Sequence, residues 1–171
     1  SMGCQVPQVL QSSEITADAT SASMVPYDEN LLERARNQWQ FGDWQSLSQL
    51  SRESLQHHPD RAKLTLMAAA GHLQMGNSTA ARQFLRQAQD WGVSSRLVNQ
   101  ILIAGVHNSL GRAAILSQQH RSALHHFEQA VAIGTPGADE KLLSQARMHE
   151  QICQLGVAVN VITSSFSHNK K

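Results

Sequence analysis

Histidines and cysteines are the residues of this chain whose type could support metal chemistry. The 171 residues include nine histidines and two cysteines. His120, His125 and His126 fall within one expected helical hairpin, and His149 stands four residues before Cys153, so one helix face would present both. A zinc site needs three or four convergent ligands, and this spacing supplies no obvious third and fourth. We therefore predict no metal site and interpret the histidines as solvated or half-buried.

Carboxylates form no evident acid–base pair either. Asp28-Glu29 and Asp139-Glu140 stand at the expected starts of two helices, where the helix dipole favours negative charge. The chain contains no glycine-rich phosphate loop, no HExxH and no GxSxG sequence. We therefore predict that the protein is not an enzyme and has no cofactor.

Charge is distributed unevenly along the chain. The totals nearly balance, with 14 Lys and Arg against 13 Asp and Glu, so nucleic acid is not an expected partner. Between Arg61 and Phe127, however, seven basic residues face one acid, whereas residues 28–60 carry six acids and three arginines. This basic middle predicts a surface that attracts an acidic partner. No apolar run approaches the ~18 residues that a membrane span needs.

The pattern of apolar residues divides the chain into three parts. Residues 1–27 lack any sustained periodicity and are expected to be a flexible or partner-dependent leader, in which Ser1-Met2 is typical of the remnant of a cleaved expression tag. Residues 28–156 have helical periodicity and form the expected domain. Residues 157–171 are interpreted as a tail that contains a β-branched segment and could include a short strand.

Helix-breaking sequences separate segments of helical length within the domain. Each break supplies glycine for a helix end or a short polar residue for the next N-cap, as at Gly42-Asp43, Gly76-Asn77 and Trp91-Gly92. The sequence therefore predicts an all-α fold. We interpret five aromatic side chains as core packing rather than ligand stacking: Trp39, Trp44, Phe84, Trp91 and Phe127.

A period of 34 residues links the first two helical pairs. Gly42-Asp43-Trp44 returns as Gly76-Asn77-Ser78 after this shift. The same shift relates Leu47 to Ala81, Leu50 to Phe84 and Ser54 to Ala88. A third pair follows with the matching residues Leu110-Gly111, Ala123-Leu124, Phe127, Ala130-Val131 and Pro136.

This period and these positions resemble the tetratricopeptide repeat (TPR) family over roughly residues 30–139. The resemblance implies a right-handed α-solenoid of about three TPR-like helical hairpins, with a C-terminal capping helix over residues 139–155. Residues 98–105 exceed the strict register, so the first helix of the third repeat is expected to begin about two turns early.

TPR domains line a concave groove with their first helices, and the groove holds an extended peptide. Carried over to this chain, the resemblance implies a partly basic groove and a protein or peptide partner that is expected to be acidic. The groove residues so implied are Arg36, Trp39, Gln40, Lys63, Gln74, Asn108 and Arg112. The most direct interpretation is a non-catalytic protein-interaction module.

Two other functions stay open at this stage. The chain could be a TPR-like accessory domain of a larger bacterial transferase-type enzyme. Gly3-Cys4 is also similar to the mature start of bacterial lipoproteins, which would make the protein a lipid-anchored periplasmic scaffold; otherwise the cytoplasm is favoured. The first hairpin needs a cover for its outer face, which the leader or a second copy in a homodimer would supply.

Overall fold

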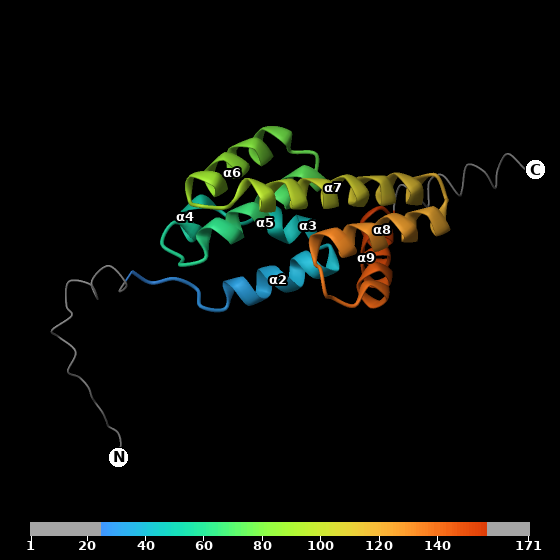
Figure 1. Ribbon diagram of the computed structural model, residues 1–171, viewed down its shortest axis with the longest axis horizontal. Coiled ribbons are helices and arrows are strands. Elements are labelled where there is room, and N and C mark those ends of the chain that lie inside the picture. Colours follow the sequence, from blue (N-terminus) through green and yellow to red (C-terminus); the bar gives the residue numbers. More distant parts are fainter. Residues whose placement is uncertain (1–24, 157–171) are drawn as a thin grey trace, which may run out of the picture.

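The computed structural model describes residues 25–156 of the chain, and the predictions for residues 1–24 and 157–171 lie outside this range. Within it, eight helices are present and no strand, so the all-α prediction is confirmed there (Figure 1). The helices are α2 (Leu31–Phe41), α3 (Trp44–Ser48), α4 (Arg52–Leu55), α5 (Arg61–Gln74), α6 (Ser78–Asp90), α7 (Ser95–Leu116), α8 (His120–Gly134) and α9 (Glu140–Gln154).

The helix ends lie where the sequence places them, with one difference. Gly42 ends α2 with φ 75°, a left-handed conformation that favours glycine. The Asp43 side chain accepts from Ser46 N at the start of α3. The helical periodicity between the Gly42-Asp43 break and His58 predicts one helix, but the structure divides this segment into α3 and α4. The division follows from Ser51, whose hydroxyl accepts a bond from Ser54 N and so caps a new helix.

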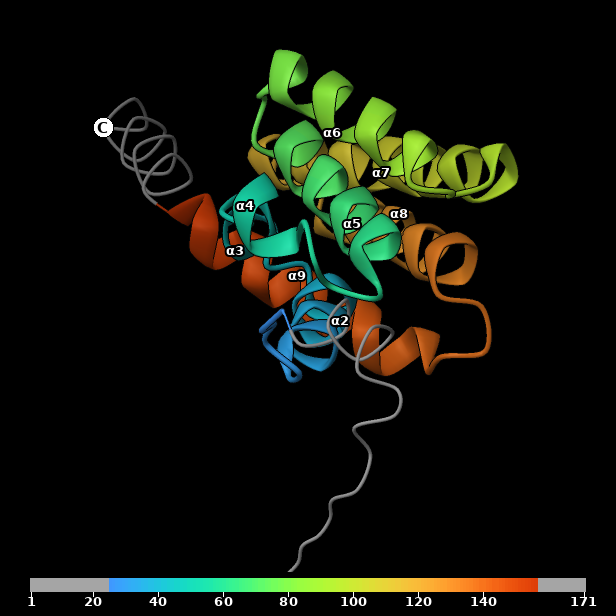
Figure 2. The same ribbon diagram turned by 90° about the vertical axis from the view of Figure 1, so that its left-hand side faces the viewer.

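Neighbouring helices pack as successive pairs. Helices α5 and α6 lie against each other, as do α7 and α8, while α5 also packs on α3 and on α7. Helix α7 has 22 residues, in agreement with the early start expected for this helix. Helix α9 packs on α8 and also reaches α2, as Figure 2 shows. The first and last described helices are therefore in direct contact.

Large and small side chains share the core. Trp44 and Phe127 are fully buried and Trp39 nearly so, whereas Phe84 and Trp91 are partly buried against their neighbours. The core interpretation is thus confirmed for Trp39, Trp44 and Phe127, while Phe84 and Trp91 pack against the core and stay partly exposed. Close helix packing depends on glycine at two points: a Cβ on Gly71 would lie 2.8 Å from Ser48 N, and one on Gly111 would lie 2.6 Å from the Phe127 ring. None of the described helices is long and apolar enough to span a membrane.

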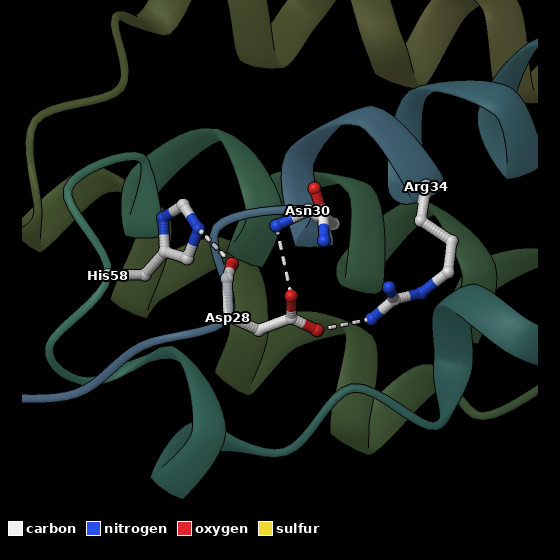
Figure 3. A network of polar contacts seen from close by, with 4 residues as sticks. All are labelled: Asp28, Asn30, Arg34 and His58. Atoms are coloured by element: carbon white, nitrogen blue, oxygen red, sulfur yellow. Dashed lines mark hydrogen bonds and ion pairs between the residues drawn. The ribbon is translucent and has the colours of Figure 1, made fainter. Parts of the chain in front are cut away.

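The segment before α2 is tied to the rest of the fold by a polar network (Figure 3). The Asp28 carboxylate accepts from the Arg34 guanidinium at 2.6 Å and from Asn30 N at 2.9 Å. These two bonds lower the pKa of Asp28, the Arg34 bond more strongly. His58 Nδ1 accepts from Asp60 N, which leaves Nε2 to donate to the Asp28 carbonyl oxygen at 3.2 Å. This acidic residue therefore has the structural role that its position at a helix start predicts.

Candidate functional site

A buried arginine from α9 contacts three of the residues that were expected to line the groove. Arg147 Nη2 donates to the carbonyl oxygens of Trp39 and Gln40, each at 2.9 Å, at the C-terminal end of α2. Its Nη1 donates to Asn108 Oδ1 on α7 at 3.3 Å. The Arg147 side chain is 1% exposed. One side chain thus joins the first helix, the long helix α7 and the last helix.

The charge of Arg147 is stabilised by dipoles rather than by a counter-ion. Among residues 25–156, no carboxylate lies within 4.0 Å of its guanidinium. Burial lowers the pKa of Arg147 to about 10, so the side chain stays protonated at neutral pH. The carbonyl oxygens at the end of α2 carry the negative end of that helix dipole. The Trp44 ring adds a cation–π contact, with its centroid 5.4 Å from the guanidinium carbon.

Gln151, one turn beyond Arg147, extends the contact to the turn after α2. Its Nε2 donates to the Gly42 carbonyl oxygen at 2.9 Å. A Cβ on Gly42 would lie 2.9 Å from Arg147 Cγ. Glycine is therefore favoured at this position for two reasons: the positive φ of its backbone and the close approach of α9. We call the contact made by Arg147 and Gln151 on α2 and its following turn the α9 clasp. It was not predicted, because both residues have types that are usually exposed.

Six of the seven expected groove residues divide into two groups, and Arg36 belongs to neither. Asn108 is 1% exposed and belongs to the clasp, and the Gln40 carbonyl is bound by Arg147. Gln74 Nε2 donates to the Gly105 carbonyl oxygen at 2.9 Å, and Arg112 Nη1 donates to the Gln74 carbonyl oxygen at 2.8 Å. Burial lowers the pKa of Arg112. These four residues therefore join helices to one another.

The arginine at position 112 is expected to contribute to stability through the end of α5. Arg112→Met keeps the aliphatic stem but leaves the Gln74 carbonyl oxygen without its donor, which should lower the free energy of unfolding by about 1–2 kcal/mol. The matched control is Arg96→Met, which removes an exposed cation from the same helix. Urea unfolding of both variants measures the difference, and equal stabilities would show that the bond contributes nothing.

The second group surrounds an open cleft between α2, α5 and α7. Trp39 and Lys63 line this cleft of about 220 Å³. The other lining residues are apolar apart from a glycine: Leu66, Met67, Leu97, Ile101 and Gly134. We call it the α2–α5–α7 cleft. Arg36 is exposed on α2 and is not among its lining residues.

A much smaller cavity lies beneath the same tryptophan. It has a volume of about 10 Å³ and is lined by Trp39, Trp44, Gln74 and Asn108, among others. Within the described range, Trp44 Nε1, Gln74 Oε1 and Asn108 Nδ2 are buried without a hydrogen-bond partner. The space is about that of one water molecule, and two donors and one acceptor are the partners that a buried water uses.

The described histidines and Cys153 form no larger set of metal ligands among residues 25–156. Cys153 Sγ lies 3.8 Å from His149 Nε2, so the two do share one helix face as expected. The rings of His107 and His126 stand 5.9 Å apart between α7 and α8. Within the part of the chain that the structure describes, no three His, Cys, Asp or Glu side chains are placed to hold a metal ion.

Comparison with known proteins adds no assignment. No family model, no curated protein and no solved structure matches this chain.

Proposed function

We propose that the protein is a non-catalytic interaction module that binds a peptide or partner protein in the α2–α5–α7 cleft. The observation that carries this proposal is an open, largely apolar cleft on the helices that the TPR resemblance assigns to the binding face. In this interpretation α2 with α3–α4, α5 with α6, and α7 with α8 are three TPR-like hairpins of a right-handed solenoid. Helix α9 is then its cap.

The lining of the cleft indicates the chemistry of the partner. Leu66, Met67, Leu97 and Ile101 offer an apolar floor that would accept one large apolar side chain. Lys63 is exposed, and it is the charged residue among those that line the cleft. An acidic group beside the apolar side chain would complement it. The expected ligand is therefore a segment with an apolar anchor next to Asp or Glu.

Peptide selection against the full chain tests this function. A displayed library of short random peptides should yield binders in which an apolar residue stands beside an acid. Met67→Glu places a carboxylate on the apolar floor, and it should weaken those binders about tenfold or more. Lys63→Glu should weaken them through charge repulsion, with a smaller effect at high salt.

The control for the cleft is a residue of similar type elsewhere on the fold. Ile103 is an exposed apolar residue on α7 that does not line the cleft, so Ile103→Glu should leave the affinity within about twofold. Binders that respond to Ile103→Glu but not to Met67→Glu would contradict the proposed location.

A further inference from the structure

A second groove, between α4 and α6, is lined by arginines from three different helices. Arg52 and Arg61 line a cleft of about 380 Å³ together with Trp91. A neighbouring cleft of about 280 Å³ shares Arg52 and adds Arg86 from α6. We call the two together the α4–α6 groove. Two of these three cations, Arg61 and Arg86, belong to the basic segment between Arg61 and Phe127. Of that segment's basic residues, the proposed peptide cleft uses Lys63.

Two of the arginines are held in place by contacts that, within residues 25–156, leave hydrogen-bond donors without a protein partner. The Arg61 guanidinium carbon lies 4.6 Å from the centre of the Trp91 ring, and Arg61 Nη1 donates to the Gln56 carbonyl oxygen at 2.9 Å. This arrangement uses one edge of the guanidinium and leaves the Nε–Nη2 edge, the fork that binds oxyanions in pairs. Arg52 Nη2 donates to Gln87 Oε1 at 2.7 Å, which orients the Gln87 amide donor away from that bond.

The acids of the groove do not neutralise these cations. Glu53 lines the first cleft and Asp90 the second. Within residues 25–156, no carboxylate oxygen lies within 4.0 Å of Arg52, Arg61 or Arg86. Each cleft therefore combines unpaired guanidinium groups with one separate acid, and glutamine side chains supply the remaining polar lining.

We propose that the α4–α6 groove binds a phosphate monoester group. Two guanidinium groups from different helices present two donor edges, and a dianionic phosphate has three terminal oxygens and enough charge to engage both. A carboxylate has one negative charge and two oxygens, which one arginine edge satisfies. Glu53 and Asp90 disfavour an extended polyanion, because a long run of negative charge would meet them.

Titration of the full chain with small probes tests the proposal. Inorganic phosphate and O-phosphoserine are added at constant ionic strength, and acetate serves as the carboxylate probe. Nuclear magnetic resonance follows the Trp91 indole N–H and the arginine Nε–H signals. We expect saturable shifts of the Trp91 and Arg61 signals with both phosphate probes, and weaker, non-saturating shifts with acetate.

Matched variants assign the effect to the groove. Arg52→Gln removes an exposed cation from the lining and should weaken phosphoserine binding about tenfold. Arg96→Gln removes another exposed cation, on α7, that does not line the groove and should change nothing. Arg61→Gln should also weaken binding. If loss of the Trp91 contact unfolds that variant, Arg86→Gln replaces it as the second test of the groove.

The outcomes separate clearly. Saturable phosphate binding that Arg52→Gln weakens and Arg96→Gln leaves intact supports the site. Acetate binding as tight as phosphate binding would assign a carboxylate instead and overturn the proposal. Shifts that never saturate, or that are equal in the two glutamine variants, would overturn it as well.

Discussion

Replacing Arg147 with leucine is expected to lower the free energy of unfolding by about 2–4 kcal/mol. The substitution leaves the carbonyl oxygens of Trp39 and Gln40 and the Asn108 amide oxygen without a donor, and each loss of a buried partner costs about 1–3 kcal/mol. Removal of a buried charge offsets part of this cost. Urea denaturation of the full chain, with the midpoint and slope fitted together, measures the change.

Two further variants show whether the hydrogen bonds or only the volume of Arg147 matter. Lys141→Leu removes an exposed cation from the same helix and should change stability by no more than about 0.5 kcal/mol. Arg147→Lys retains the charge but lacks the planar donor edge, so it should fall between leucine and arginine. If Arg147→Leu is as stable as the unchanged protein, the clasp does not hold α9 in place.

The clasp and the proposed peptide cleft share a residue. Trp39 lines the cleft, and its carbonyl oxygen accepts from Arg147. The same ring packs edge-on against Trp44, with 5.5 Å between centroids, and Trp44 in turn lies beside the Arg147 guanidinium. Helix α9 therefore stabilises the position of Trp39 through Arg147, although no residue of α9 lines the cleft.

Local features of the fold were predictable because short-range chemistry determines them. Gly42, Gly76 and Gly92 each adopt a positive φ at the breaks that the sequence marks. The length of α7 followed from the lack of a strong breaker between Ser94 and Ser117. Burial of Trp44 and Phe127 followed from their helical spacing among small residues.

The α9 clasp was not predictable in the same way. Arg147 and Trp39 are separated by 108 residues, and no repeat or periodicity relates them. Arginine and glutamine on a terminal helix are usually solvated, and the sequence indicated only a capping helix over residues 139–155. Arg147 and Gln151 are buried only because α9 packs against the end of α2. The groove residues Asn108 and Gln40 changed role for the same reason.

Glycine-to-alanine substitution at two helical positions should have opposite effects on stability. At Gly71, in α5, a Cβ would lie 2.8 Å from both Ser48 N and the Trp44 carbonyl oxygen and 2.9 Å from Leu47 Cβ. Two of these neighbours are backbone atoms of α3 and cannot rotate away, so α3 and α5 would have to separate. Gly71→Ala is therefore expected to cost about 2–3 kcal/mol despite the better helix propensity of alanine.

Gly105, in α7, is the matched control. It is also a glycine within a helix, but no backbone atom of another described helix lies close to the position of its Cβ. A Cβ there would meet Gln74 Nε2 at 3.4 Å, an ordinary contact with the end of a side chain. Gly105→Ala should therefore raise the free energy of unfolding by up to about 1 kcal/mol through propensity. Thermal and urea unfolding of the two variants measure the contrast. A Gly71→Ala protein as stable as Gly105→Ala would mean that α3 does not approach α5 as closely as the structure shows. The position of Trp44, on α3, beside Trp39 would then be wrong as well.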